Sequence, residues 1–358
     1  MTGSGIATVA RQEFRLRIRA GRWKLLLAIF FAVLLGFTLL LRGALGTLAN
    51  DQLPFKGTVL YGGLMLFVLG LALLVVPALA AQSVNGDRER GTLATLQVTR
   101  LTAAEITLGK FLAAWGTALV FLALTFPLVA YAMTQGGVQF GRVVVVTLVL
   151  AVLLGTVCAI SLWLSSALSR TTTSGVLAYV AVFGLTIGTL ITFGLITAVT
   201  AEKVKQPQIN CTGGGPGPNG SFVEPDCQPV PGVFYESTRA RTDRTWWLLA
   251  PNPFVVLADA APQLPALEPQ YSEGDSRGVR ARDLDPLGQL GSTVRDLRLP
   301  PRDAGIGFTF QEVEREGPGP IWPTGLAVNI VLAAGALLLT VRRLRTPSRT
   351  LPRGQRVA

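Results

Sequence analysis

The residues of this chain best suited to specific chemistry lie in one polar segment, 82–110, between two apolar stretches. Its centre holds charged side chains followed by small and apolar ones: Arg88, Glu89, Arg90, Gly91, Thr92, Leu93 and Leu96. The charged groups can make charge-assisted hydrogen bonds to a partner protein, while the leucines can fill an apolar groove on it. We therefore predict a contact surface here. The plainer interpretation is a solvated turn with interfacial anchors.

Signatures of catalysis and of nucleotide binding are missing from the sequence. The pair Gly109-Lys110 is followed by Phe111 and lacks the preceding glycine of a phosphate-binding loop. The chain contains no His, no Cys-x-x-Cys and no Gly-x-Ser-x-Gly. We expect no catalytic site, cofactor or metal on this chain, and any energy for work to come from another protein.

The end of the same polar segment contains a signal for the start of a helix. Thr102 and Glu105 are three residues apart, just before an apolar run. This spacing predicts a capping box, in which each side chain accepts a hydrogen bond from the other residue's backbone N–H. Lys110 follows about a turn later, and we expect its ammonium group to extend to the lipid headgroups.

The composition of the chain is that of a membrane protein with several spans. Apolar residues make up 50% of the chain, charged residues only 15%, and the mean hydropathy is +0.47. A spanning helix needs roughly 20 apolar residues. Six runs meet this requirement, at residues 25–41, 59–81, 111–133, 143–168, 174–198 and 321–341. The predicted fold is an all-α polytopic membrane protein with six transmembrane helices, the first five within 25–198.

The distribution of charge predicts the orientation of the spans. If both termini are cytoplasmic, the inner segments hold more than half of the 32 Lys and Arg residues. Of the 21 acidic residues they hold only Glu13, Asp87, Glu89 and Glu105. Inner loops are enriched in cations, so we predict that 1–24 and the basic tail 342–358 face the cytoplasm. The basicity needs no nucleic acid to explain it.

The N-terminal segment 1–24 is predicted to be an amphipathic helix on the membrane surface. Ile6, Ala10, Phe14 and Ile18 recur at every fourth position, and arginines lie on another face. A basic face attracts anionic lipid whether or not it also contacts a protein. Anchoring and coupling to a partner both remain open.

The fifth span combines small and hydroxyl residues: Gly184, Thr186, Gly188 and Thr189. The two glycines are spaced to let another helix approach closely. Such residues serve ordinary helix packing, or they line a pathway or a dimer seam. No span carries an ionisable residue in its middle, which argues against a proton-driven transporter. Asn329 in the last span is expected to make a packing hydrogen bond.

Residues 199–320 form a long insert on the predicted outer side, before the sixth span at 321–341. The insert is rich in Pro and Gly and has no sustained period, so short elements and loops are expected. Cys211 and Cys227 are predicted to form a disulfide there, with two free thiols as the alternative. Trp246–Ala261 is apolar but short and is expected to dip into the outer membrane interface. The competing interpretation is a seventh span.

The segment Glu89-Arg90-Gly91-Thr92-Leu93, with Leu96, 101–105 and Gly109-Lys110, resembles the cytoplasmic loop of type-2 ATP-binding-cassette (ABC) exporter permeases. The basic N-terminus and the six-span layout are similar as well. The resemblance covers about two-thirds of the chain and leaves most of the outer insert unmatched. It implies two permease subunits, identical or related, on separate ATPase subunits that bind ATP and Mg²⁺. It also implies a coupling helix at about 85–98 that docks into a cleft of the ATPase.

The resemblance places the protein in the cell membrane of a bacterial-type cell. Its uncharged interior suits an amphiphilic or hydrophobic cargo, and its outer insert could bind an extracytoplasmic partner. Two other functions fit the residues: a membrane scaffold or sensor that binds a ligand through the outer insert, and a secondary transporter. A soluble ATPase with Walker motifs encoded beside this chain would separate the permease from the scaffold.

Overall fold

The computed structural model describes residues 3–19, 22–48, 56–89, 101–212, 215–216, 222–223, 226–264, 285–299 and 319–345. Within these ranges six helices are long and apolar enough to cross a membrane. They are Trp23–Thr47, Lys56–Glu89, Ala103–Thr134, Phe140–Ala167, Thr171–Val199 and Trp322–Leu344. Each overlaps one of the predicted apolar runs. The predicted all-α polytopic membrane fold is confirmed.

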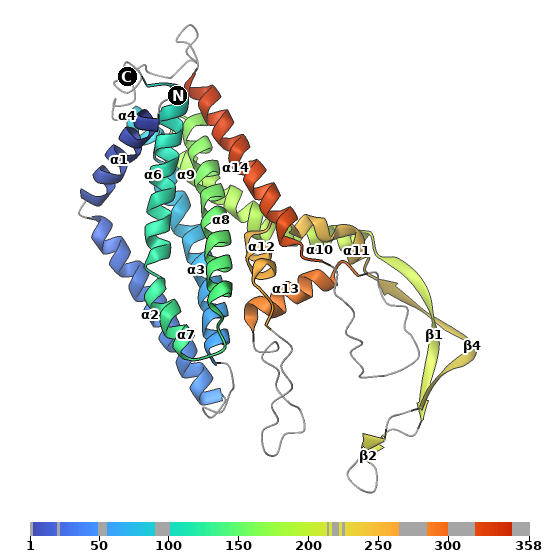
Figure 1. The fold of residues 1–358 in the computed structure, drawn as a ribbon. Helices are drawn as coiled ribbons and strands as arrows, with labels where there is room; N and C mark the ends of the chain where they lie inside the picture. The colour runs from blue at the N-terminus through green and yellow to red at the C-terminus, as the bar shows by residue number, and fades with distance from the viewer. Residues whose placement is uncertain are drawn as a thin grey trace.

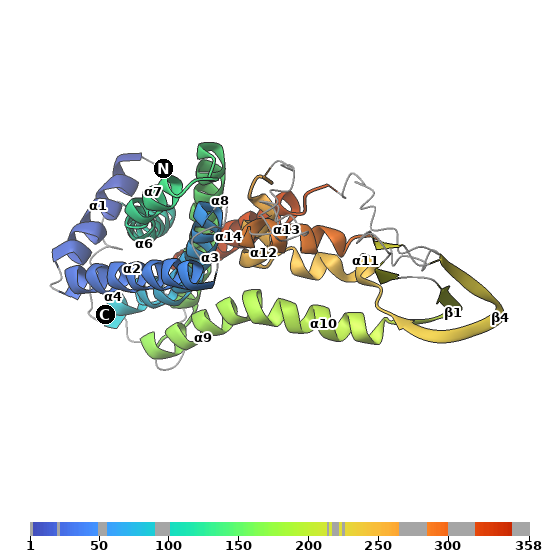
Figure 2. The ribbon, with the colours of Figure 1, turned by 90° about the horizontal axis from the view of Figure 1, so that it is seen from below.

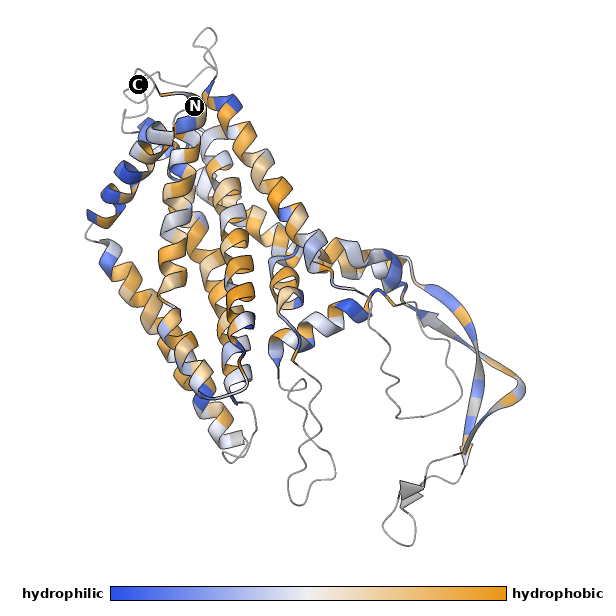
Figure 3. Ribbon diagram, in the orientation of Figure 1, coloured by the Kyte–Doolittle hydropathy of each residue, from blue (hydrophilic) through white to orange (hydrophobic). Residues whose placement is uncertain are grey.

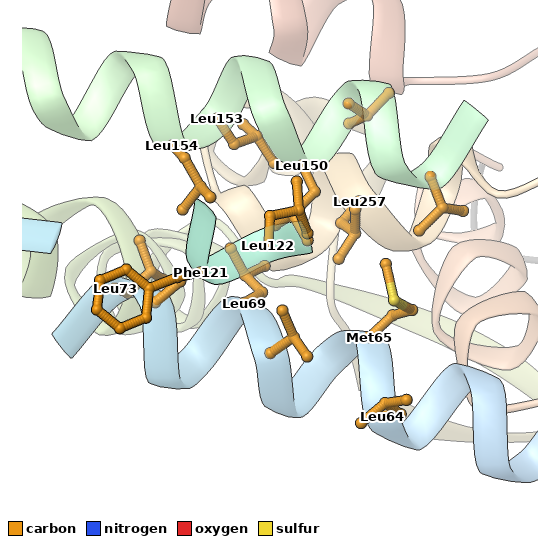
Figure 4. Close-up of a cluster of buried hydrophobic side chains, with 14 of the residues drawn as sticks. Leu64, Met65, Leu69, Leu73, Phe121, Leu122, Leu150, Leu153, Leu154 and Leu257 are labelled. Carbon is orange, nitrogen blue, oxygen red and sulfur yellow. The ribbon is translucent and has the colours of Figure 1, made fainter. Parts of the chain in front are cut away.

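The core of the bundle is formed by α3 (Lys56–Ala80), α6 (Ala103–Ala123) and α8 (Phe140–Ala167). These helices are apolar on most faces, as expected for helices that pack against neighbours on several sides. Leu69, Phe121, Leu150 and Leu154 meet in their shared interior, as Figure 4 shows. Helix α14 (Trp322–Leu344) packs along α8. The spans are predominantly hydrophobic, whereas α1 (Gly3–Arg19) carries many hydrophilic residues (Figure 3).

Two spans lie at the edge of this core. Helix α2 (Arg22–Leu48) packs on α3, and the fifth span runs along the side of the bundle toward the outer segment, as Figure 2 shows. The fifth span consists of α9 (Thr171–Phe183), a π-helical turn η1 (Gly184–Gly188) and α10 (Thr189–Val199). Only 17% of the first span's apolar window and 6% of the fifth span's are buried.

The third span is broken near its C-terminal end. Helix α6 ends at Ala123, and α7 (Phe126–Thr134) begins one turn later with Pro127 in its first turn. Proline has no N–H to continue the hydrogen-bond ladder of the preceding helix, so the ladder restarts at this residue. Thr125 supports the break by donating a hydrogen bond from Oγ1 to the Leu122 carbonyl oxygen at 2.7 Å.

The segment between the fifth and sixth spans, which we call the outer segment after its predicted side, begins with a long antiparallel ladder. Strand β1 (Glu202–Thr212) pairs with β4 (Asp226–Arg239), with an irregularity between Pro207 and Ile209. A short pair, β2 (Gly215–Pro216) with β3 (Phe222–Val223), follows its tip. Cys211 is disulfide-bonded and lies directly opposite Cys227 in the ladder, whereas Cys158 in α8 is free and buried. Figure 1 shows the ladder projecting away from the bundle.

The rest of the described outer segment is helical: α11 (Thr242–Thr245), the 3₁₀ turn η2 (Trp246–Leu249), α12 (Pro253–Ala260) and α13 (Pro286–Asp296). The depth of Trp246–Ala261 in the membrane stays a prediction, and the structure shows what the helical part of this segment contacts. Val256 and Leu257 of α12 are buried in the main core cluster, and α12 packs against α8, α13 and α14. Helix α12 is also too short to be a seventh span. Its apolar residues are explained by packing against other helices.

Candidate functional site

The predicted contact segment lies where α1 packs along α6, at the end of the bundle that also carries α4 (Asn85–Glu89) (Figure 1). The close approach of α1 depends on Gly109. A Cβ atom at this position would lie 2.6 Å from the Cβ of Val9 and 3.1 Å from the Ile6 carbonyl oxygen. Val9 is itself buried. Gly109 therefore makes the room that the N-terminal helix occupies.

Lys110, the next residue, is the centre of an ion-pair cluster that we call the Lys110 cluster. Its Nζ donates to the carboxylates of Glu13 in α1 and Asp87 in α4, and to the Ser83 carbonyl oxygen at 3.0 Å. The side chain has no solvent exposure, while the two carboxylates retain 18% and 19%. A buried ammonium needs such partners, because removal from water disfavours its charge.

This arrangement corrects the expectation that Lys110 extends to the lipid headgroups. The ammonium is held inside the protein by two acidic groups from separate helices. It joins α1, the end of the second span and the third span into one unit. Glu13 and Asp87, which the sequence analysis used only for counting charge, therefore have a structural role.

The cap of the third span has the predicted geometry. The Glu105 N–H donates to Thr102 Oγ1 at 3.3 Å, and the Thr102 N–H donates to Glu105 Oε2 at 2.8 Å. Glu105 is 3% exposed. Its negative charge lies in the first turn of α6, where the helix dipole favours an anion. The capping box fixes where the chain enters the third span.

Helix α4 is held against the connection between the fourth and fifth spans. The backbone N–H groups of Val84 and Asn85 both donate to Ser165 Oγ at 3.1 Å. Arg88 Nη1 donates to the Leu168 carbonyl oxygen at 3.3 Å, and Glu89 Oε1 accepts from the Thr171 N–H at 3.2 Å. Thr171 is the first residue of α9, so Glu89 lies at the positive end of that helix.

Arg88 and Glu89 thus bond to the chain's own connection between spans four and five. The sequence analysis had considered them only as contacts to a partner. Arg90, Gly91, Thr92, Leu93 and Leu96 lie outside the described residues. The structure brings Arg88, Glu89, Thr102, Glu105 and Lys110 to the same end of the bundle.

The predicted residues of the fifth span lie at its π-helical turn. Asn252 Nδ2 donates to the Thr186 carbonyl oxygen at 2.8 Å and to Thr189 Oγ1 at 2.9 Å. Asn252 Oδ1 also accepts from the backbone N–H groups at the start of α12. A π-turn shifts the backbone register and leaves a carbonyl free for such an outside donor. Thr186 and Thr189 therefore connect the fifth span to the outer helices.

The two glycines of this span are not in close contact with another described helix. A Cβ atom at Gly184 would have no neighbour within 4 Å, and one at Gly188 would meet only the Phe183 carbonyl oxygen of the same helix. The close helix approach expected from their spacing is therefore absent from the described part of a single chain.

Buried carboxylates attach the outer helices to the spans. Asp259 of α12 accepts hydrogen bonds from the Ile321 and Trp322 N–H groups at the start of α14 and pairs with Arg295 of α13. Asp285, just before α13, pairs with Arg142 of α8, and each of these two side chains is at most 2% exposed. Asn329 donates to the Pro251 carbonyl oxygen at 3.1 Å, which confirms the expected packing hydrogen bond.

The fold and this site define a class of protein. The chain is a multi-spanning helical membrane protein whose N-terminal surface helix is fixed to the third span through a Gly-Lys pair. Among the described residues no group of three or more His, Cys, Asp or Glu could hold a metal ion.

The chain belongs to the ABC-2 family of transporter proteins, whose model matches residues 7–290. It is therefore a membrane-spanning subunit of an ABC transporter. The match includes residues 199–290 of the outer segment, most of which the motif resemblance had left unmatched. No curated protein matches the chain.

Proposed function

We propose that this chain is the permease of an exporter, driven by separate ATPase subunits that bind ATP and Mg²⁺. The observation that supports this most directly is the Lys110 cluster. Force applied to α1 or α4 would reach the third span through Glu13, Asp87 and Lys110 without passing through a flexible loop. A surface helix that served only as a lipid anchor would not need this buried connection.

The ATPase would dock on the end of the bundle that carries α1 and α4. The exposed side of α1 forms a basic groove of about 400 Å³ that includes Arg11, Arg15 and Arg19. Arg88 and Glu89 hold the end of α4 against the connection between the fourth and fifth spans. Arg90, Gly91, Thr92, Leu93 and Leu96 remain the proposed contact residues. An acidic rim around an apolar cleft on the ATPase would complement both surfaces.

We place this end in the cytoplasm of a bacterial-type cell. Helix α1 and the last turn of α14, with Arg342 and Arg343, lie at the same end of the molecule (Figure 1). Cationic residues gather on the cytoplasmic side of membrane proteins and attract anionic lipid there. The β1–β4 ladder then lies outside the cell, where its projecting strands are accessible to an extracytoplasmic partner.

A second permease, identical or related, would cover the fifth span. Val176, Val180, Phe183, Ile187 and Leu195 form part of its exposed apolar surface. Gly184 would let a facing helix approach closely, because nothing occupies the space beside it. A pathway between two such subunits would have an apolar, hydroxyl-containing wall, which suits an amphiphilic or hydrophobic cargo.

Site-specific photo-crosslinking in native membranes tests this function. A photoreactive residue replaces exposed Arg15 in α1 or, as the matched control, exposed Phe140 at the start of α8 on the other end. We expect a crosslink to a soluble protein with Walker motifs from position 15 and none from position 140. Crosslinking from position 140 alone, or no ATPase at either position, would refute the proposal.

A further inference from the structure

A cavity of about 300 Å³ lies beside the Lys110 cluster, between α1, the start of α2 and the end of the second span. Its walls are of two kinds. Trp23, Leu26 and Leu79 provide apolar surface, and Glu13, Arg17 and Gln82 provide polar groups. A cavity with both kinds of wall at the surface end of a membrane bundle suits a molecule that has a charged head and an apolar tail.

Arg17 is the cation of this cavity. Its Nη1 donates to Thr117 Oγ1 at 3.3 Å, inside the bundle, and within the described part of the chain it has no carboxylate within 4.0 Å. Burial lowers the pKa of Arg17 below its ordinary value, and the nearby charge of Glu13 only partly offsets this. An anion in the cavity would compensate the guanidinium charge.

The acidic groups of the cavity belong to the Lys110 cluster. Glu13 uses Oε1 for Lys110, and its side chain keeps 18% of its exposure. Among the described residues, Lys110 is the cation that both carboxylates, Glu13 and Asp87, contact. The cavity therefore has a positive side at Arg17 and a negative side at Glu13.

We propose that this cavity binds the headgroup of a zwitterionic aminophospholipid from the surrounding membrane. The phosphate would bind Arg17, whose planar guanidinium can donate two parallel hydrogen bonds to phosphate oxygens. The primary ammonium would donate to Glu13 and to the Gln82 side-chain oxygen. The acyl chains would leave along Trp23 and Leu26. An anionic headgroup without an ammonium would leave Glu13 facing a second negative charge.

The primary ammonium group distinguishes this ligand from other phospholipids with the same phosphate. Phosphatidylcholine has the same charge, but its methylated nitrogen has no N–H to donate to Glu13. Phosphatidylglycerol has the phosphate without the cation. Binding to the purified chain needs no ATPase, so this inference can fail or succeed independently of the proposed transport function.

The test is native mass spectrometry of the purified, delipidated full chain with dioctanoyl forms of phosphatidylethanolamine, phosphatidylcholine and phosphatidylglycerol. We expect phosphatidylethanolamine to bind at least about tenfold more tightly than the other two, a difference of roughly 1.4 kcal/mol. Arg17→Gln should weaken its binding about tenfold or more, because the phosphate loses a charge-assisted contact. The control, Arg15→Gln, alters an exposed arginine outside the cavity and should have no effect.

A second variant separates binding from folding. Ala78 lines the cavity and is exposed, so Ala78→Trp should fill the space without touching Arg17 or its bond to Thr117. We expect it to abolish the preference for phosphatidylethanolamine. Equal binding of the three lipids, tighter binding of phosphatidylglycerol, or unchanged binding by Ala78→Trp would overturn the proposal.

Discussion

The substitution Lys110→Met should release the N-terminal helix from the bundle. It removes the cation shared by Glu13 and Asp87 and keeps an unbranched side chain of similar length. Removing one partner of a buried ion pair costs roughly 3–5 kcal/mol, because the remaining charge is left uncompensated. The two carboxylates keep 18% and 19% exposure, so water can replace part of the lost contact. We therefore expect the free energy of unfolding to fall by an amount near the lower limit of this range, about 3 kcal/mol.

The assay is thermal unfolding of the purified chain in detergent, followed by tryptophan fluorescence. A loss of about 3 kcal/mol in the free energy of unfolding corresponds to a fall in Tm of roughly 4 °C for a protein of this size. Limited proteolysis with trypsin provides a local measurement, because Arg15 and Arg19 of α1 should be cut faster once the helix detaches. The control Lys24→Met changes an exposed lysine near the start of α2 and should alter stability by less than about 0.5 kcal/mol.

A triple variant tests the cause of the loss. Combining Lys110→Met with Glu13→Gln and Asp87→Asn removes all three charges, so no uncompensated carboxylate remains. Replacing a whole buried ion pair is far less costly than breaking it. We expect the triple variant to recover at least half of the lost stability. The reasoning is refuted if Lys110→Met unfolds at the same temperature as Lys24→Met, or if the triple variant is no more stable than the single one.

Three further predictions use the same unfolding assay. Gly109→Ala should cost about 1–3 kcal/mol by overpacking, and Val9→Gly should restore part of that loss if their close contact is the cause. Asn252→Ala should cost about 1–2 kcal/mol. Asn252→Asp keeps the acceptor that caps α12 but loses the donor to the fifth span, so stability equal to wild type would show that this donor contributes nothing. Arg142→Met should cost about 3–5 kcal/mol, and adding Asp285→Leu should restore most of it, whereas additive losses would contradict a buried ion pair.

The membrane spans and the capping box of the third span were predictable because each depends on residues that are close together in the sequence. Apolar runs of membrane length identify the six helices, and the spacing of Thr102 and Glu105 is sufficient for the capping box. The role of Lys110 was not predictable in this way. Its partners Glu13 and Asp87 are 97 and 23 residues away, and a lysine near a helix start ordinarily extends to the headgroups. Only the packing of α1 on α6 brings them together.

The sequence did contain one unused signal for this site. Gly109 precedes Lys110 inside a long helix, where glycine is unfavourable by about 1 kcal/mol relative to alanine unless packing requires it. The packing of α12 inside the protein was not predictable for a related reason. Its apolar residues fit a membrane interface as well as a protein core. The hydrogen bonds that fix it in the core, from Asn252 Nδ2 to the Thr186 carbonyl oxygen and from the Ile321 N–H to Asp259, join segments that are distant in the sequence.

The distribution of buried contacts indicates which spans can move. Half or more of the apolar windows of spans two, three and four are buried, at 56%, 50% and 61%. The corresponding windows of spans one and five are buried to 17% and 6%. Moving α2 or α9–α10 against the core would therefore disrupt few buried side chains, whereas separating α3, α6 and α8 would expose the central cluster. The Lys110 cluster attaches α1 and α4 to this rigid core, and Glu89 attaches α4 to the start of the fifth span. Force on α4 would thus move the core as one body and reach the loosely packed fifth span through the bond at Thr171.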